Sequence, residues 1–135
     1  MDSVQIETSD LRLFETFLGE VLKARLVERR DHLGKDSIRG YCYRGILVVV
    51  RKNHESPRPT GWVQLNFAVP DVEIVQRELE TTLAEPRLAS LSQAERERVV
   101  RIRLKPDVRR GNRKAIRLEV LGPEGFVVGF NQYKS

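Results

Sequence analysis

The chain has 135 residues, of which 40% are hydrophobic, and a formal net charge of +5. This length suits a single domain, and the apolar share argues against disorder. No run of about eighteen apolar residues is present, and the polar, acidic start is unlike a secretory signal, so no membrane span is expected. The single cysteine, Cys42, cannot form an intramolecular disulfide, which favours the reducing cytoplasm.

The positive charge is concentrated in the second half of the chain. Eleven Lys or Arg residues and three acidic residues lie between Arg87 and Arg117, whereas the rest has 13 basic and 16 acidic residues. Such a segment favours an anionic partner of some kind. A solvated face that only confers solubility accounts for the same pattern equally well.

The first half alternates strand and helix signals. Val4–Thr8 predicts a short strand, and Ser9 or Asp10 is a candidate N-cap for the helix that follows. That helix carries an apolar stripe at helical spacing, made of Leu11, Phe14, Leu18, Val21 and Leu22. Strands are then expected at Arg25–Asp31, Ile38–Arg44 and Ile46–Val50, with a loop at His32–Asp36. The all-apolar run Ile46–Val50 is typical of a strand covered on both faces.

The second half repeats this order after a polar linker, Lys52–Gly61. Val63–Val69 predicts a strand, and Pro70 and Asp71 open a second amphipathic helix. A short helical piece is expected within Pro86–Arg98, capped by Ser90 or Ser92. A strand at Val99–Lys105, a turn at Arg109–Lys114 and a closing hairpin follow. The hairpin strands, Ala115–Leu121 and Phe126–Phe130, flank Gly122-Pro123-Glu124-Gly125, where proline and glycine suit a tight turn.

The two halves are similar in sequence order as well as in element type. Asp10-Leu11 and Asp71-Val72 lie 61 residues apart, close to half the chain, and each pair opens a helix after a strand. A duplicated α+β module accounts for this offset. With the Gly-Pro-Glu-Gly turn in the last hairpin, the chain resembles the vicinal oxygen chelate superfamily of glyoxalases, bleomycin-resistance proteins and extradiol dioxygenases.

This resemblance implies a fold of two βαβββ modules that form cupped mixed sheets with helices on the outer face. Module 1 would span about residues 1–53 and module 2 about 61–135, within a single domain. It also implies a homodimer. In the family's metal enzymes, the ligand positions would correspond here to Ser3, Gln64 and Gly129, with a fourth in Ile46–Val50.

Of these positions only Gln64 could bind a metal ion, which needs about three suitable donors. We therefore expect no family-type metal site and no cofactor. His32 and His54 fall in predicted loops without partner ligands at recognisable spacing. The sequence also lacks a Gly-x-Ser-x-Gly motif, a Cys–His pair and a Gly-rich phosphate loop, so no catalytic residue is assigned.

The sequence favours a metal-free binding protein over an enzyme, with a small-molecule ligand, which could be anionic, held in the concave sheet. Aromatic walls, amide hydrogen-bond partners, two arginines for an anion and one carboxylate make up the candidate site. These residues are Tyr41, Tyr43, Trp62, Gln64, Asn66, Asn131, Arg101, Arg103 and Glu7. For each aromatic residue, ordinary core packing is an equally good interpretation.

Three other functions remain open. A regulatory or scaffold protein could bind an acidic protein partner through the basic C-terminal half. Nucleic-acid binding through Arg109–Lys114 is disfavoured, because the stretch lacks interleaved aromatic residues and matches no recognition motif. An enzyme in which Glu7 alone acts as acid or base would need a buried carboxylate, and the sequence does not establish burial.

Overall fold

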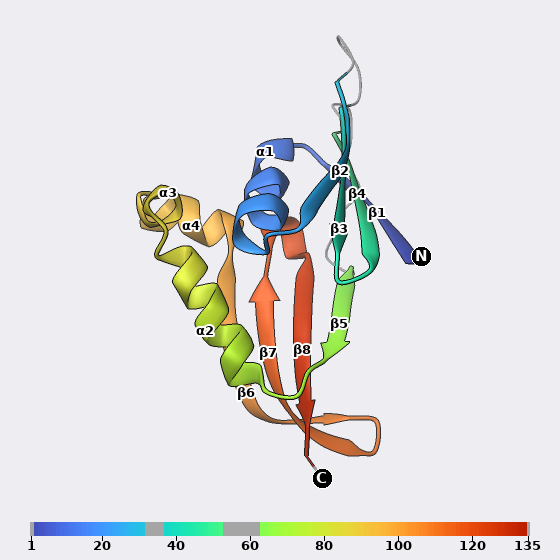
Figure 1. Cartoon of the computed structure of the whole chain (residues 1–135), viewed down its shortest axis with the longest axis vertical. Helices are drawn as coiled ribbons and strands as arrows, with labels where there is room; N and C mark the ends of the chain where they lie inside the picture. Colours follow the sequence, from blue (N-terminus) through green and yellow to red (C-terminus); the bar gives the residue numbers. More distant parts are fainter. Residues whose placement is uncertain (1, 32–36, 53–62, 135) are drawn as a thin grey trace. The chain divides into compact units, whose positions relative to one another are not determined.

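The computed structural model describes residues 2–31, 37–52 and 63–134. The chain divides into two compact units between residues 62 and 63. Each unit contains a strand, a helical segment and three further strands, and each builds one four-stranded mixed sheet (Figure 1). The predicted fold class, an α+β fold of two βαβββ modules, is therefore confirmed.

The first module consists of β1 (Asp2–Thr8), α1 (Leu11–Phe14), η1 (Glu15–Val21), β2 (Arg25–Arg30), β3 (Ile38–Tyr43) and β4 (Ile46–Lys52). Its sheet has the order β1-β4-β3-β2, with β1 parallel to β4 and the other pairs antiparallel. The helical segment begins at the predicted cap, since Asp10 accepts a hydrogen bond from the Arg12 amide.

The helical segment differs from an ordinary α-helix after its first turn. Residues Glu15–Val21 form a π-helix, and the amide of Leu22 bonds the carbonyl of Phe17, five residues earlier. The predicted apolar stripe is nevertheless buried, and Gly19 lies against the ring of Tyr41. The helix therefore covers the face of the sheet to which Tyr41 belongs.

The expectation that Ile46–Val50 is covered on both faces was wrong. Val48 and Val50 are fully buried, while Leu47 and Val49, on the opposite face of the strand, are only half-buried. An unbroken apolar run does not distinguish a strand with one buried face from a strand with two.

The second module consists of β5 (Gln64–Ala68), α2 (Val72–Leu83), α3 (Pro86–Ala89), α4 (Gln93–Val99), β6 (Arg101–Arg110), β7 (Arg113–Leu121), η2 (Pro123–Gly125) and β8 (Val127–Tyr133). The sheet order is β5-β8-β7-β6, which repeats the first module's order strand for strand. Asp71 caps α2, and Ser92 caps α4 in a capping box with Glu95.

The two hairpins of this module differ in detail from their predicted forms. The predicted six-residue turn at Arg109–Lys114 is shorter, because β6 continues to Arg110 and β7 starts at Arg113. Gly111 takes the left-handed conformation that such a short turn needs. In the closing turn Gly125 has positive φ as expected, and Glu124 does too.

The register of the second sheet separates its two faces. Gln132 Oε1 accepts a hydrogen bond from the amide of Val72 at the start of α2, so the helix lies on the side of Gln132, Phe130 and Val128. Alternation then puts Gly129 and Asn131 on the other side. We call this other side the polar face, and its strand residues include Gln64, Asn66, Arg101, Arg103, Lys105, Arg117, Glu119, Gly129 and Asn131.

Among the described residues, no helix has the length and apolar composition that crossing a membrane requires.

Candidate functional site

The centre of the polar face is a buried arginine, Arg117 on β7, which is only 3% exposed. Its Nε donates to Glu119 Oε2 at 2.9 Å. Its Nη1 donates to Asn66 Oδ1 at 2.8 Å and to Asn131 Oδ1 at 3.2 Å. Because Asn66 lies on β5 and Asn131 on β8, the guanidinium joins three neighbouring strands and is held in one position.

Glu119 is the acceptor shared by three cations. Its Oε1 accepts from Arg103 Nε and Nη2, at 3.0 and 2.7 Å, and lies 3.3 Å from Lys105 Nζ. Burial raises the pKa of this carboxyl, but the hydrogen bonds from Arg117, Arg103 and Lys105 outweigh it and hold the pKa at about 2. Glu119 is therefore ionised at neutral pH.

The charges in this cluster do not balance. Arg103, Lys105 and Arg117 supply three positive charges against the single negative charge of Glu119. The side chains of Arg103 and Lys105 are 55% and 42% exposed, so they remain accessible from solvent. Such a surplus of accessible N–H donors can hold an anionic group by charge-assisted hydrogen bonds.

Five of the predicted site residues lie on this face. Asn66, Asn131 and Arg103 contact the Arg117–Glu119 pair directly, as described above. Gln64 precedes Asn66 by two residues on β5, and Arg101 precedes Arg103 by two residues on β6. Both are exposed, and by strand alternation they point to the same side.

The three predicted residues of the first module do not lie on one face of its sheet. Glu7 pairs in register with Arg51, on the side away from the helix. Tyr41 is buried on the helix side, and the half-buried Tyr43 shares its parity on β3. Burial raises the pKa of Tyr41, and the charge of Glu15 adds to this effect. Trp62, His32 and His54 lie outside the described residues.

Sequence reasoning missed the two residues at the centre, Arg117 and Glu119, and their neighbour Lys105. The signal was present, because Arg117 and Glu119 alternate with Ile116, Leu118 and Val120 in a strand of the closing hairpin. Charged residues there must share one face. What the sequence could not supply was the register, which places Glu119 opposite both Arg103 and Gly129.

The described residues do not fit the metal that the family resemblance would imply. They contain no group of three or more His, Cys, Asp or Glu side chains that could hold an ion. At position 129 there is no side chain, and a Cβ built there would overlap the guanidinium carbon and both terminal nitrogens of Arg117. A permanent cation therefore fills the space in which a ligand at this position would lie.

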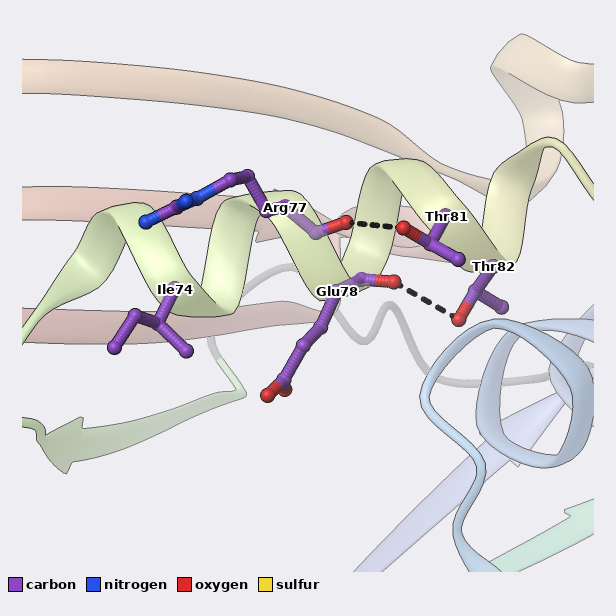
Figure 2. Close-up of a pocket in the computed structure, with 5 residues that line it drawn as sticks. All are labelled: Ile74, Arg77, Glu78, Thr81 and Thr82. Carbon is purple, nitrogen blue, oxygen red and sulfur yellow. Dashed lines mark hydrogen bonds between the residues drawn. The ribbon is translucent and has the colours of Figure 1, made fainter.

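A separate hollow of about 640 Å³ runs along the outer side of α2 (Figure 2). Its described lining is Ile74, Arg77, Glu78, Thr81 and Thr82, all from this one helix. The hydroxyls of Thr81 and Thr82 donate to the carbonyls of Arg77 and Glu78, at 2.9 and 3.0 Å. Both threonine hydroxyls therefore already donate to carbonyls of their own helix. The polar face, where the side chains of Arg103 and Lys105 reach solvent, is the stronger candidate for a binding site.

The comparisons with known proteins concern the fold. No protein-family model matches the chain, and no curated protein sequence is significantly similar. The glyoxalase family protein from Enterococcus faecalis has a TM-score of 0.67 at 14% identity, with 98% of this chain and 96% of that chain covered. TnmS3, an antibiotic-binding protein from a Streptomyces species, has a TM-score of 0.60 at 17% identity, with 99% and 95% covered.

A mutant of FosX, a fosfomycin resistance protein from Listeria monocytogenes, is similar at a TM-score of 0.61 and 10% identity. It was solved with Mn(II) and a dihydroxypropylphosphonic acid, and the match covers 97% of this chain and 90% of that chain. The chain therefore has the fold of the vicinal oxygen chelate superfamily. These identities are too low to carry over a ligand or an activity.

Proposed function

We propose that the protein binds a small anionic molecule on the polar face of the second sheet, without a metal ion and without transforming the ligand. The observation that carries this proposal is the unbalanced cluster of Arg103, Lys105 and Arg117 around Glu119. A cytoplasmic location and a homodimeric state, both expected from the sequence, are part of the same proposal.

The arrangement of donors suits an anionic group such as a carboxylate, phosphate or sulfate. Arg103 donates from Nε and Nη2 to Glu119, whereas its Nη1 has no acceptor among the described residues and can meet an anionic oxygen. Lys105 adds a point charge. Gln64, Asn66 and Arg101 extend the same face with amide and guanidinium groups that would fix the rest of the ligand. Other proteins of this fold also bind small molecules, and TnmS3 is one that binds an antibiotic.

Binding is a better account of this face than catalysis. A general base works best with a pKa near the working pH, and Glu119 with a pKa of about 2 holds protons too weakly. The guanidinium and ammonium groups of the cluster are hydrogen-bond donors only and have no lone pair with which to accept a proton. The face therefore offers donors and fixed charge, which suit recognition of an anion.

The test is a thermal-shift screen of small carboxylates, phosphates and sulfates, beside neutral analogues, at constant ionic strength. A ligand that binds only the folded state raises the melting temperature.

Replacing both exposed cations, as Arg103→Gln with Lys105→Gln, should weaken binding of the most stabilising anion by about tenfold or more, because each charge-assisted hydrogen bond contributes about 1.5–3 kcal/mol. Arg96→Gln on α4 is the matched control and should bind normally. Stabilisation by neutral compounds alone, or by none, would reject the proposal.

One observation favours a second candidate, the binding of an acidic protein. The β6–β7 hairpin presents exposed basic side chains near its tip, at Arg109, Arg110, Arg113 and Lys114. Arg113 also lies over the ring of Tyr133, at 4.3 Å from the centroid. A pull-down that returns one acidic partner at low salt, and loses it when Arg109 and Arg110 become Gln, would support this candidate. Recovery of the protein without a partner would count against it.

A further inference from the structure

We infer that Arg117 and Gly129 form a matched pair that sets the specificity of the polar face, with a fixed guanidinium in the space that a side chain at position 129 would need. This inference rests on the proposed function, because it names the group that selects an anionic ligand. It also explains why the residues present do not fit a metal ion.

The first step is the clash at Gly129. A Cβ atom there would come within 3.0 Å of the guanidinium carbon and both terminal nitrogens of Arg117, a separation that real Cβ atoms essentially never show. At Gly45 and Gly111 a Cβ would meet nothing within 4 Å. The tightest contact of Gly40 in the first module is 3.1 Å, and that of Gly19 is 3.4 Å. The missing side chain at 129 is therefore a requirement of the guanidinium's position.

The second step is how the guanidinium is held. Glu119 fixes Nε from one side, while Asn66 and Asn131 fix Nη1 from the other. Among the described residues Nη2 has no hydrogen-bond acceptor, so its N–H groups are left for a ligand. The charge lies on a central strand of the sheet, and its N–H groups have a fixed direction.

The third step is the consequence for ligand choice. A metal ion binds neutral oxygen ligands as well as anionic ones and can be removed by a chelator, whereas a guanidinium stays charged and recognises planar anionic groups. A face built on Arg117 should therefore accept carboxylate-, phosphate- or sulfate-type groups with no metal loaded. A neutral molecule that offers only two adjacent oxygens should bind poorly.

The test uses Gly129→Ala, which introduces the clash, together with Arg117→Gln and the double variant. The clashing group is the end of a long side chain, so Gly129→Ala should displace the guanidinium without unfolding the protein. Gly19→Ala, which meets only ordinary contact distances, is the matched control. Inorganic phosphate at constant ionic strength is the anion probe, and Mn²⁺ after chelator treatment is the metal probe.

We expect phosphate to raise the melting temperature of the wild type and of Gly19→Ala, and Gly129→Ala and Arg117→Gln each to lose most of that rise. The double variant should lose no more than either single variant, because both act through one guanidinium. A wild-type response in Gly129→Ala would overturn the inference, as would Mn²⁺ binding that Gln64→Ala abolishes.

Melting temperatures without any ligand separate the inference from the proposed function. Gly129→Ala should lower the melting temperature of the wild type by more than it lowers that of Arg117→Gln, since the latter lacks the clashing group. An equal loss in both backgrounds would refute the pairing itself. If the pairing holds but no anion stabilises the wild type, the proposed function fails, and with it the role of Arg117 in specificity.

Discussion

The two modules have the same strand order, yet each buries an arginine on a different face of its sheet. In the first module Arg39 lies on the helix side of β3, where Nε pairs with Glu15 at 3.3 Å and Nη2 with Asp31 at 2.9 Å. Its Nη1 donates to the carbonyl of Ile38 at 3.0 Å. In the second module Arg117 lies on the face away from the helix.

The difference in charge balance is more instructive than the difference in position. Arg39 contacts two carboxylates, of which Asp31 also pairs with Arg29, so two positive charges face two negative charges. Each of its three nitrogens has an acceptor, and the side chain joins the helix to the sheet. Around Arg117 three positive charges share one carboxylate. Similar topology thus supports a structural arginine in one module and a candidate binding arginine in the other.

The largest expected effect comes from removing the charge that neutralises the second cluster. Glu119→Gln keeps the shape of the side chain but leaves three cations close together, one of them buried. Loss of one partner of a buried ion pair costs about 3–5 kcal/mol, and we expect the lower end because Arg103 and Lys105 reach solvent. Chemical denaturation measures this change, and Glu97→Gln on the exposed side of α4 should change stability by less than about 0.5 kcal/mol. If Glu119→Gln had the same free energy of unfolding as the wild type, the Glu119 charge would not stabilise the cluster, and this description of it would be wrong.

Acid should weaken the same cluster in a defined pH range. The pKa of Glu119 falls from 4.5 to about 2 on folding, so its contribution to stability is complete above pH 4.5 and is lost as the pH falls toward 2. Allowing for the exposed partners, that contribution is about 2 kcal/mol. Denaturation curves across this range should show the loss in the wild type and a shallower one in Glu119→Gln. Identical pH dependence in the two proteins would reject the low pKa.

Breaking the ion pairs of Arg39 in the first module should lower the free energy of unfolding by less than Glu119→Gln does. Arg39→Met removes a buried guanidinium, but Glu15 and Asp31 are 37% and 52% exposed and can be hydrated once it has gone. We expect a loss of about 1–2 kcal/mol in the free energy of unfolding, with anion binding unchanged. A parallel loss of anion binding would show that the two arginines do not have separate roles.

The smallest expected effects fall equally on both modules, at their helix caps. Asp10 accepts from the amide of Arg12, and Asp71 accepts from the amide of Glu73 at 2.9 Å. Replacing either aspartate by alanine should cost about 1 kcal/mol. Thermal denaturation of the two single variants measures this, and a difference of more than about 1 kcal/mol between them would break the equivalence of the modules.

Much of this fold follows from the sequence. Period-two alternation located the strands, and the repeated Asp-Leu and Asp-Val pairs located both helix starts, because capping and alternation depend on neighbouring residues alone. The backbone hydrogen-bond pattern of the first helical segment was harder to infer. Its apolar stripe from Leu11 to Leu22 suits an α-helix as well as the π-helix that forms over Glu15–Val21.

The candidate site could be predicted only in part. Asn66, Arg103 and Asn131 were found because strand parity puts them on one face. Arg117 and Glu119 were not found, since their importance depends on which residues lie beside them across three strands. For Tyr41 the sequence left both a site role and core packing open, and in the structure the side chain is buried on the helix side of the sheet. Register between strands is a long-range property, and local pattern does not determine it.

The most direct test is to follow the arginine Nε–H signals by NMR while inorganic phosphate is added at constant ionic strength. We predict saturable shifts for Arg103 and Arg117 with a common midpoint, and no shift for Arg39, which lies in the first module with its Nε paired to Glu15. Shifts that do not saturate and are similar for all exposed arginines, or an unmoved Arg117, would contradict an anion site on the polar face.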